Sequence, residues 1–381
     1  MRVTGDWLTD PGAQAVCAIL LRAGHRALFV GGCVRNALLG LPVADVDLAT
    51  DALPDRVMAL AEAAGLRAVA TGLEHGTVTV VAAGEPHEVT TFRRDVETFG
   101  RRAVVAFSTD MAEDAARRDF TINALYATPA GEVLDPLGSG LMDLAVRRVR
   151  FVGEPDQRIA EDYLRILRFF RFFAWYGDAA AGPDAAGLAA CAAHADGVTG
   201  LSRERLGAEM KKLLSAPDPS AAVAAMEAAG VLARLIPGAS AAALPRLARL
   251  EGDAPPRWQR RLATLGGDGG AAGLRLSRTD ARSMAIIAAE LEGSRPPAEL
   301  GYRFGPWVAS DVVLARAARA GELPPPGWRE AIGRGVAAEF PVRAADLMPG
   351  LKGPALGRAL KALEARWIAA DFAPTRDELL R

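Results

Sequence analysis

The sequence is poor in cysteine and contains no long apolar segment. Cys17, Cys33 and Cys191 are odd in number and far apart, which excludes a disulfide framework and a paired-cysteine metal site. No apolar run approaches the ~20 residues that a membrane-spanning helix requires, so we expect no membrane partner. The first ten residues carry acidic side chains and a glycine before any apolar stretch, unlike a secretory signal. We therefore expect a cytoplasmic protein with reduced thiols.

The chain also lacks an excess of positive charge. Its formal net charge is −1 and its pI is about 6.5, which argues against a protein that holds nucleic acid by a general positive field. An RNA partner would need a local basic groove. Arginine supplies nearly all of the positive charge, because lysine occurs only at positions 211, 212, 352 and 361.

The pattern of the sequence changes near residue 146. Before it, short β-rich runs alternate with helices, and after it the chain is helical throughout. A chain of 381 residues exceeds the usual limit for a single core, so we expect several domains. We predict an α+β fold, in which a small mixed sheet with helices is followed by an elongated all-α part. The predicted domains are a head (1–145), a helical neck (146–215), a helical body (216–275) and a helical tail (276–381).

A strand, a glycine turn and a helix are predicted close to the N-terminus. Residues 27–30 form a short apolar strand that ends at Gly31 and Gly32, and a helix begins after it. Glycine lets the backbone approach a ligand closely, and a helix start offers N–H groups to phosphate oxygens. Arg35 adds a positive charge there. Such a turn is more often plain turn geometry than a phosphate site, and its glycine spacing is not that of the dinucleotide fingerprint.

Acidic residues follow at positions that suit metal binding. Asp45 and Asp47 lie in a predicted strand, residues 43–49, so both carboxylates would project from one face. Two adjacent carboxylates are costly unless a cation neutralises them, and Mg²⁺ prefers carboxylate and phosphate oxygens. Glu88 begins the second strand of an antiparallel pair that we predict over 77–81 and 88–92, and it is a candidate third ligand. The alternatives are a solvated acidic edge for the pair and an ordinary exposed glutamate.

Two further segments are predicted to be arginine-rich helices. Residues 117–125 place Arg118 beside Asp119 and Asn123, whose side chains are able to hydrogen-bond across one turn. Residues 161–172 combine a buried phenylalanine face with arginines that occupy about a third of the helix circumference. Buried guanidinium groups rarely go unpaired, so we favour a nucleotide as their partner over a solvated basic face. These arginines are Arg165, Arg168 and Arg171.

The segment between the predicted sheet and the first of these helices has no clear periodicity. Residues 93–116 are charged and read neither as strand nor as helix. We predict a long loop there, which is either functional or a plain insertion.

Five motifs, in this order and spacing, resemble the class II tRNA nucleotidyltransferase and bacterial poly(A) polymerase family. They cover the first ~175 residues, and a less specific helical motif follows at residues 201–214. The five are GGCVRN (31–36), DVD (45–47), RRDFTINAL (117–125), DPLGSGLMDL (135–144) and EDYLRILRFFRF (161–172).

The resemblance implies a polymerase-beta-like nucleotidyltransferase head that adds C, C and A to the 3′ end of tRNA from CTP and ATP. It implies that Asp45 and Asp47 bind two Mg²⁺ ions. It also implies that Asp162 and Arg165 act as a protein template for the incoming base. The residues that it assigns to the triphosphate and sugar are Gly32, Arg35, Arg118, Arg168 and Arg171.

The helical remainder is expected to bind the acceptor arm of tRNA by its backbone shape. The candidate contacts are Arg203, Arg205, Lys211 and Lys212. An ordinary solvated helix face is the alternative for each of them.

Two departures from the family and one local segment bear on the choice of activity. Asn36 stands where members of the family usually carry Asp, and the 135–144 motif is one residue longer than the common form, near Ser139. The segment GLEHGTVTV (72–80) resembles the CCA-adding branch, although a poly(A) polymerase and an A-only enzyme remain alternatives. A catalytically silent RNA-binding protein is the alternative from another class, and the intact Asp45 and Asp47 argue against it.

Overall fold

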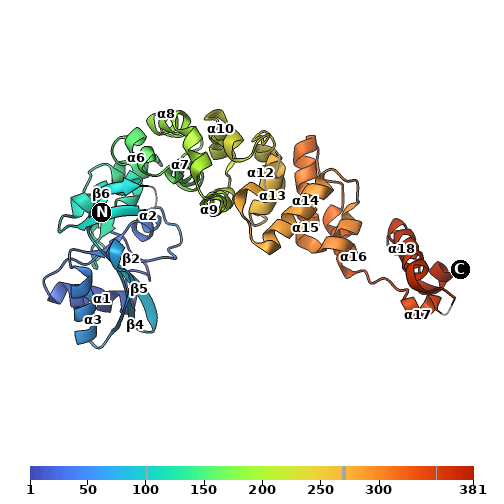
Figure 1. The fold of residues 1–381 in the computed structure, drawn as a ribbon, viewed down its shortest axis with the longest axis horizontal. Helices are drawn as coiled ribbons and strands as arrows, with labels where there is room; N and C mark the ends of the chain where they lie inside the picture. The colour runs from blue at the N-terminus through green and yellow to red at the C-terminus, as the bar shows by residue number, and fades with distance from the viewer. Residues whose placement is uncertain (100–101, 268–271, 349) are drawn as a thin grey trace. The chain divides into compact units, whose positions relative to one another are not determined.

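The computed structural model describes residues 1–99, 102–267, 272–348 and 350–381. The chain divides into two compact units, Met1–Leu235 and Ile236–Arg381. In the described residues the strands all lie in the first unit, and the second unit is helical (Figure 1). The predicted α+β class is therefore confirmed. The prediction of four domains within these two units stays a prediction.

The first unit contains a mixed sheet with the strand order β3-β4-β5-β2-β1-β8-β9, and β6 pairs with β7 beside it. β2 and β5 run parallel, and the other neighbouring strands run antiparallel. The strands are β1 (Leu28–Val30), β2 (Asp47–Thr50), β3 (Arg67–Gly72), β4 (Thr77–Ala82), β5 (Glu85–Thr91), β6 (Arg93–Phe99), β7 (Arg102–Phe107), β8 (Tyr126–Ala127) and β9 (Val133–Leu134).

Helices cover the sheet and then continue the first unit. They are α1 (Pro11–Arg22), α2 (Gly32–Leu38), α3 (Pro54–Ala63), α4 (Met111–Ala116), α5 (Gly140–Ala145), α6 (Pro155–Glu161), α7 (Leu164–Tyr176), α8 (Ala185–Ala193), α9 (Arg203–Leu214), α10 (Ser220–Ala228) and α11 (Val231–Leu235). Short 3₁₀ turns lie between them: η1 (Leu73–His75), η2 (Thr121–Asn123) and η3 (Ala195–Gly200).

Alternating burial along β4 fixes which face of the sheet packs inward. Val78 and Val80 are fully buried, whereas Thr77 and Thr79 between them are only partly buried. Helices α1 and α3 pack against the buried side of β4 (Figure 1). Asp10 caps α1, because its carboxylate accepts the Ala13 amide hydrogen bond at 2.7 Å. The pattern leaves the other side of the sheet for polar side chains.

A cluster of phenylalanine rings joins the sheet to α7. The Phe120 ring lies 5.0 Å from Phe151 and 5.0 Å from Phe172, and Phe151 stacks on Phe169 at 5.4 Å. Helix α8 packs directly on this cluster, because a Cβ on Gly187 would lie only 2.8 Å from the Phe169 ring. Burial of these large rings stabilises the junction between the sheet and the helices.

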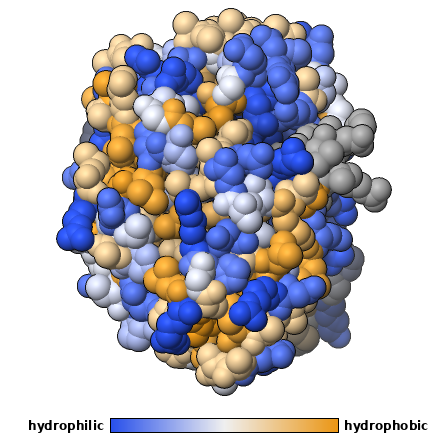
Figure 2. Space-filling view, turned by 90° about the vertical axis from the view of Figure 1, so that its left-hand side faces the viewer, coloured by the Kyte–Doolittle hydropathy of each residue, from blue (hydrophilic) through white to orange (hydrophobic). Residues whose placement is uncertain are grey.

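Several predicted elements of the first unit are confirmed. The strand, glycine turn and helix appear as β1, Gly31 and α2, and the antiparallel pair appears as β4 and β5. Ala83 and Gly84 alone form the turn of that pair, with positive φ angles of 52° and 86°. Apolar and polar residues alternate in small patches across the face shown in Figure 2.

Four predictions of local structure were wrong. The strand predicted over 43–49 begins only at Asp47, so Asp45 lies in the preceding loop. Residues 117–125 are no helix but an irregular segment with the short turn η2. The helix predicted over 161–172 is interrupted between α6 and α7, where Asp162 is extended. Residues 93–116 form the β6–β7 hairpin and α4, with residues 100–101 outside the described part.

The interruption at Asp162 has a local cause. The Asp162 carboxylate accepts a hydrogen bond from the Leu164 amide at 3.1 Å, which competes with continuation of the helix. The segment after α4 has a different cause, because Phe120 forms an isolated bridge with Phe151 and cannot remain helical. In both cases a short-range contact overrides the helical periodicity of the sequence.

The second unit is built from helices and contains a buried ionic network. The elements are α12 (Leu244–Glu251), α13 (Trp258–Leu265), η4 (Ala272–Leu274), α14 (Arg278–Leu291), α15 (Pro297–Ala320), α16 (Trp328–Ala337), α17 (Ala344–Leu347), α18 (Gly353–Ala369) and α19 (Arg376–Leu380). Asp311 is fully buried and pairs with Arg257 at 2.9 Å and with Arg260 at 3.0 Å. None of the helices in the described ranges is both long and apolar enough to cross a bilayer.

The ring cluster predicts a large loss of stability when Phe169 is truncated. In the Phe169→Ala variant we expect the free energy of unfolding to fall by about 3–5 kcal/mol, because a fully buried ring leaves a cavity. Urea unfolding followed by circular dichroism measures this. The control is Met142→Ala, which changes a side chain that is 70% exposed and should cost less than about 0.5 kcal/mol. Equal unfolding curves for the two variants would contradict the prediction.

Candidate nucleotide and metal site

The glycine turn between β1 and α2 requires glycine at its first position. Gly31 has a φ of 73°, and a Cβ built on it would lie 3.3 Å from Nη1 of Arg118 and 3.6 Å from the Asn123 carbonyl oxygen. A side chain at this position would be strained and would push against Arg118. The glycine turn and the Arg118 guanidinium therefore lie side by side, as binding of one phosphate group by both would require.

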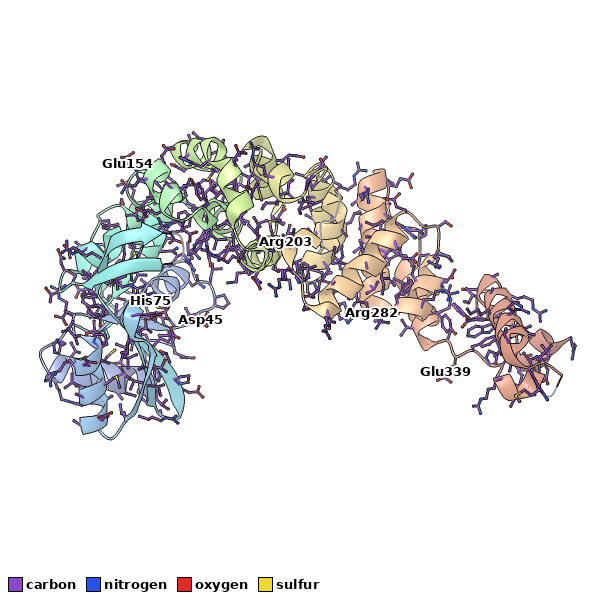
Figure 3. The ribbon with its side chains drawn as sticks, in the orientation of Figure 1. Asp45, His75, Glu154, Arg203, Arg282 and Glu339 are labelled. Atoms are coloured by element: carbon purple, nitrogen blue, oxygen red, sulfur yellow. The ribbon has the colours of Figure 1, made fainter. Side chains whose placement is uncertain are left out.

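Three carboxylates lie next to this turn. Asp47 faces Glu88 across the parallel β2–β5 ladder, and Asp45 lies two residues before Asp47 in the loop from α2, where Figure 3 labels it. All three side chains belong to exposed residues. The pKa of Asp47 is raised, first by partial desolvation and then by the negative charge of Glu88, while Arg118 acts in the opposite direction. The protein alone leaves excess negative charge here.

The residues fit a Mg²⁺ site that substrate oxygens complete. Among the described residues no group of three or more His, Cys, Asp or Glu side chains is arranged to hold a metal ion. Mg²⁺ is commonly held by one or two carboxylates together with substrate phosphates and water rather than by a complete protein cage. Asp45 and Asp47 supply two such carboxylates, and the carboxylate of Glu88 lies opposite Asp47 on β5.

A chain of side-chain hydrogen bonds links the glycine turn to α7. The Asn123 side chain accepts a hydrogen bond from Arg35 and donates one to Asp119 at 2.9 Å. Asp119 in turn accepts two hydrogen bonds from Arg168, one of them from Nε at 2.8 Å. The predicted Asp119–Asn123 bond is therefore confirmed, although it forms in an irregular segment and not across a helix turn.

Arg35 is buried and has several partners at this junction. Its guanidinium carbon lies 3.9 Å from the centre of the Tyr176 ring, and Nη2 donates to the Tyr176 hydroxyl at 2.8 Å. Nη2 also donates to Asn36 at 2.9 Å, and the Asn36 amide donates to the Pro42 carbonyl at 2.8 Å. Burial lowers the pKa of Arg35 from its ordinary value. Asn36 thus ties Arg35 to the loop that carries Asp45.

The α7 arginines pair with carboxylates of the protein itself. Arg165 donates to Glu161, Arg168 to Asp119, and Arg171 to Glu209 at 2.6 Å. The sequence predicted a nucleotide as the anionic partner of these arginines. In the structure, carboxylates of the chain itself pair with them. Contact with a nucleotide by these arginines stays a prediction.

A pocket of about 680 Å³ opens beside the break between α6 and α7. Asp162 and Tyr163 line it, together with Arg205 from α9. Arg205 donates to the Asp162 carboxylate at 2.6 Å, so it lies in the pocket and not on a solvated helix face. Of the other candidate RNA contacts, Arg203 and Lys212 are exposed on α9, where Figure 3 labels Arg203, and Lys211 is half-buried.

Sequence reasoning missed several residues that position the site. Asp114 and Tyr126 hold Arg118, and Glu161 and Glu209 hold two of the α7 arginines. The four-residue spacing of Asp114 and Arg118 was a usable signal, and so was that of Glu161 and Arg165. Nothing local in the sequence marks Tyr126 or Glu209, because their partners are distant or lie on another element.

Comparison with known proteins agrees with this geometry. Residues 27–150 match the family model described as "Poly A polymerase head domain", and residues 184–243 match "Probable RNA and SrmB- binding site of polymerase A". The CCA-adding enzyme of Geobacillus stearothermophilus is 35% identical over 383 residues, which cover 94% of this chain and 91% of that protein. The crystal structure of the Bacillus stearothermophilus CCA-adding enzyme in complex with CTP has a TM-score of 0.76 at 29% identity, covering 97% of this chain and 94% of that one.

Other relatives align over a shorter region. The human protein named CCA tRNA nucleotidyltransferase 1, mitochondrial, is 41% identical over 208 residues, or 54% of this chain. The chain spans about half the length of this protein and of its mouse counterpart, 48% of each.

The head and RNA-binding matches define a nucleotidyltransferase of the poly(A) polymerase class. The chain belongs to the family of CCA-adding tRNA nucleotidyltransferases and bacterial poly(A) polymerases, which confirms the resemblance seen in its motifs.

The Asp119–Arg168 pair predicts a specific acid sensitivity. Burial acts to raise the pKa of Asp119, but the Arg168 charge and three hydrogen bonds lower it to about 2. The ionised pair therefore contributes stability above pH ~4, the unfolded pKa, and this contribution is lost as the pH falls toward 2, amounting to about 2 kcal/mol. Urea unfolding at pH 5 and pH 2.5 should show a smaller acid loss in Asp119→Asn than in the wild type. An unchanged acid loss in the variant would refute this role of the pair.

Proposed function

We propose that this protein adds C, C and A to the 3′ end of tRNA, using CTP and ATP and releasing pyrophosphate. The observation that carries the proposal is the placement of Asp45, Asp47 and Glu88 beside Arg118 and the Gly31 turn. It is supported by the near full-length similarity to the CCA-adding enzyme of Geobacillus stearothermophilus. The predicted head, residues 1–145, would carry this site.

Asp45 and Asp47 are the residues that would hold Mg²⁺, and Glu88 adds negative charge at the same edge. Bound there, Mg²⁺ would neutralise triphosphate oxygens and favour ionisation of the attacking hydroxyl. Arg118 points its Nη1 at the glycine turn and would bind the triphosphate, with Gly31 and Gly32 allowing close approach. The 3′-hydroxyl of the RNA would attack the α-phosphate in line, and pyrophosphate would leave.

Base selection would occur in the pocket beside α6 and α7. The Asp162 carboxylate is oriented by Arg205 and would accept a hydrogen bond from the exocyclic amine that C and A share. Arg165 would donate to a ring nitrogen or carbonyl, and its hydrogen bonds within the described residues use Nη1 alone. U and G lack the amine at that position of the ring, so they would not donate this hydrogen bond to the partly buried carboxylate.

The substrate RNA would extend along the helical part of the chain. Arg203, Lys211 and Lys212 on α9 are the proposed contacts to the acceptor arm, because A-form RNA presents mainly phosphates and 2′-hydroxyls. Arg205 is better placed to orient Asp162 than to contact RNA. The predicted neck (146–215) would thus serve base selection, and the body (216–275) and tail (276–381) would bind RNA.

Incubation with CTP, ATP and a tRNA transcript that lacks its last three nucleotides tests the proposal. We expect a product three nucleotides longer than the transcript, and chelation of divalent cations should abolish it. A long A tail, or a single A added only to tRNA ending in CC, would instead indicate poly(A) or A-only activity. No incorporation into any RNA, with RNA binding retained, would indicate a silent binding protein.

The same assay tests the carboxylates. We expect Asp47→Asn to lower the incorporation rate by on the order of 10³, because the cation would lose a charged ligand. The control is Asp55→Asn, which changes an exposed carboxylate in the first turn of α3. Thermal unfolding must show that both variants remain folded. A rate within a few-fold of the wild type for Asp47→Asn would exclude the proposed metal site.

Asp162 should determine which nucleotide is added. In Asp162→Ala we expect the preference for CTP over UTP, measured as the ratio of kcat/KM values, to fall by about 100-fold, because a specific acceptor is lost. Asp196→Ala is a matched control, since Asp196 lines the same pocket but its side chain is 90% exposed and pairs with Arg234. An equal loss of selectivity in the two variants would count against a role for Asp162 in base recognition.

A further inference from the structure

Asp114 is a buried carboxylate that holds the side chain beside the glycine turn. It lies on α4, it is 1% exposed, and its carboxylate accepts hydrogen bonds from Arg117 Nε at 2.8 Å and from Arg118 Nη2 at 3.1 Å. It also accepts a bond from the Tyr126 hydroxyl at 2.6 Å. These donors lower the pKa of Asp114, although burial alone would raise it. The residue is therefore an ionised acceptor enclosed by donors.

Tyr126 completes the hold on Arg118. Its ring is fully buried, and its hydroxyl accepts a hydrogen bond from Arg118 Nε at 3.2 Å while donating to Asp114. The Arg118 guanidinium is thus fixed through Nε and Nη2. Its third nitrogen, Nη1, is the atom that faces Gly31. The hydrogen bonds from Arg118 to Asp114 and Tyr126 therefore fix the orientation of this nitrogen.

The same carboxylate is tied to the base of the β6–β7 hairpin. The amide of Arg93, the first residue of β6, donates to Asp114 at 3.4 Å. At the same base, where the chain leaves β7, the Ser108 amide donates to the Phe92 carbonyl at 2.8 Å. The Ser108 hydroxyl donates to Glu113 at 2.5 Å. The Phe92 amide donates a hydrogen bond to the carbonyl of Thr50, the last residue of β2, at 2.7 Å. The base of the hairpin is therefore bonded to α4 through Asp114 and Glu113, and to the strand that carries Asp47 through Phe92.

We propose that Asp114 is a positioning residue that aims Arg118 at the triphosphate and couples this aim to the β6–β7 hairpin. The proposal rests on the proposed role of Arg118 and the Gly31 turn in nucleotide binding. Asp114 itself is too deeply buried to touch substrate, so it acts only through Arg118. A neutral amide at this position would replace one acceptor with a donor that faces other donors, which would release the guanidinium from its fixed orientation.

The first test separates nucleotide binding from turnover in Asp114→Asn. We expect KM for both CTP and ATP to rise about tenfold, because the nucleotide would lose one charge-assisted contact. We expect kcat and the KM for tRNA to stay within about twofold of the wild type. The matched control is Asp143→Asn, because Asp143 is also 1% exposed and pairs with an arginine, Arg150, at 2.8 Å. We expect it to lower the melting temperature similarly and to leave both nucleotide KM values unchanged. Equal KM increases in the two variants would overturn the proposal.

The second test asks whether Asp114 acts through Arg118. In an Arg118→Ala background, Asp114→Asn should cause no further rise in nucleotide KM, because the group that it positions is already absent. Tyr126→Phe should raise KM in the same direction as Asp114→Asn, and the combined variant should show less than the product of the two effects. Independent, multiplicative effects in these cycles would refute the proposal that Asp114 acts through Arg118.

A third measurement does not depend on catalysis. The Arg118 Nε–H resonance should be protected from solvent exchange in the wild type by its bond to Tyr126, and it should lose this protection in Asp114→Asn. If the wild-type protein bound and incorporated no nucleotide while this signature appeared, the proposed function would fail and the positioning network would stand. If Arg118 kept its protection in Asp114→Asn, the positioning role would be wrong whatever the activity.

Discussion

The ion pair between Asp119 and Arg168 is the contact on which the rest of the site depends. It links the segment after α4 to α7 across 49 residues of sequence, and neither side chain is more than about a third exposed. A charge pair in such surroundings is costly to break, because the remaining partner keeps its desolvation penalty. Through Asn123 the pair is also linked to Arg35, so hydrogen bonds connect the glycine turn to α7 within the first unit.

Local sequence signals predicted the parts of the site that depend on local geometry. The Gly31 turn and α2 were predictable because a glycine pair between an apolar strand and an amphipathic helix has few other conformations. The DVD motif supplied Asp45 and Asp47 as candidate ligands, which stay a prediction. The strand begins only at Asp47, and the parallel pairing with β5 that places Glu88 opposite is a non-local contact. Strand formation in β6 and β7 also depends on pairing partners, which charge and periodicity do not encode.

The arginines of α7 also show that the sequence does not identify contacts between distant residues. Their spacing and their apolar neighbours correctly indicated guanidinium groups with anionic partners, but not which partners, and the groups are partly rather than fully buried. The Glu161–Arg165 pair is local, four residues apart, whereas Arg171 reaches Glu209 across 38 residues. Only the packing of α7 against α9 brings the second pair together. Burial of charge was therefore predictable from composition, and its neutralisation required the tertiary structure.

Parallel pairing of β2 with β5 has an evolutionary consequence. Side chains in a strand alternate between faces, so sliding β5 by a single position would carry Glu88 to the opposite face while leaving the backbone ladder intact. The turn at Ala83 and Gly84 sets this alignment from the adjoining strand. Length variation in that turn is thus constrained by the position of Glu88 in the middle of β5, and a chain with an altered turn would have to restore the alternation elsewhere in the strand, for example with a bulge.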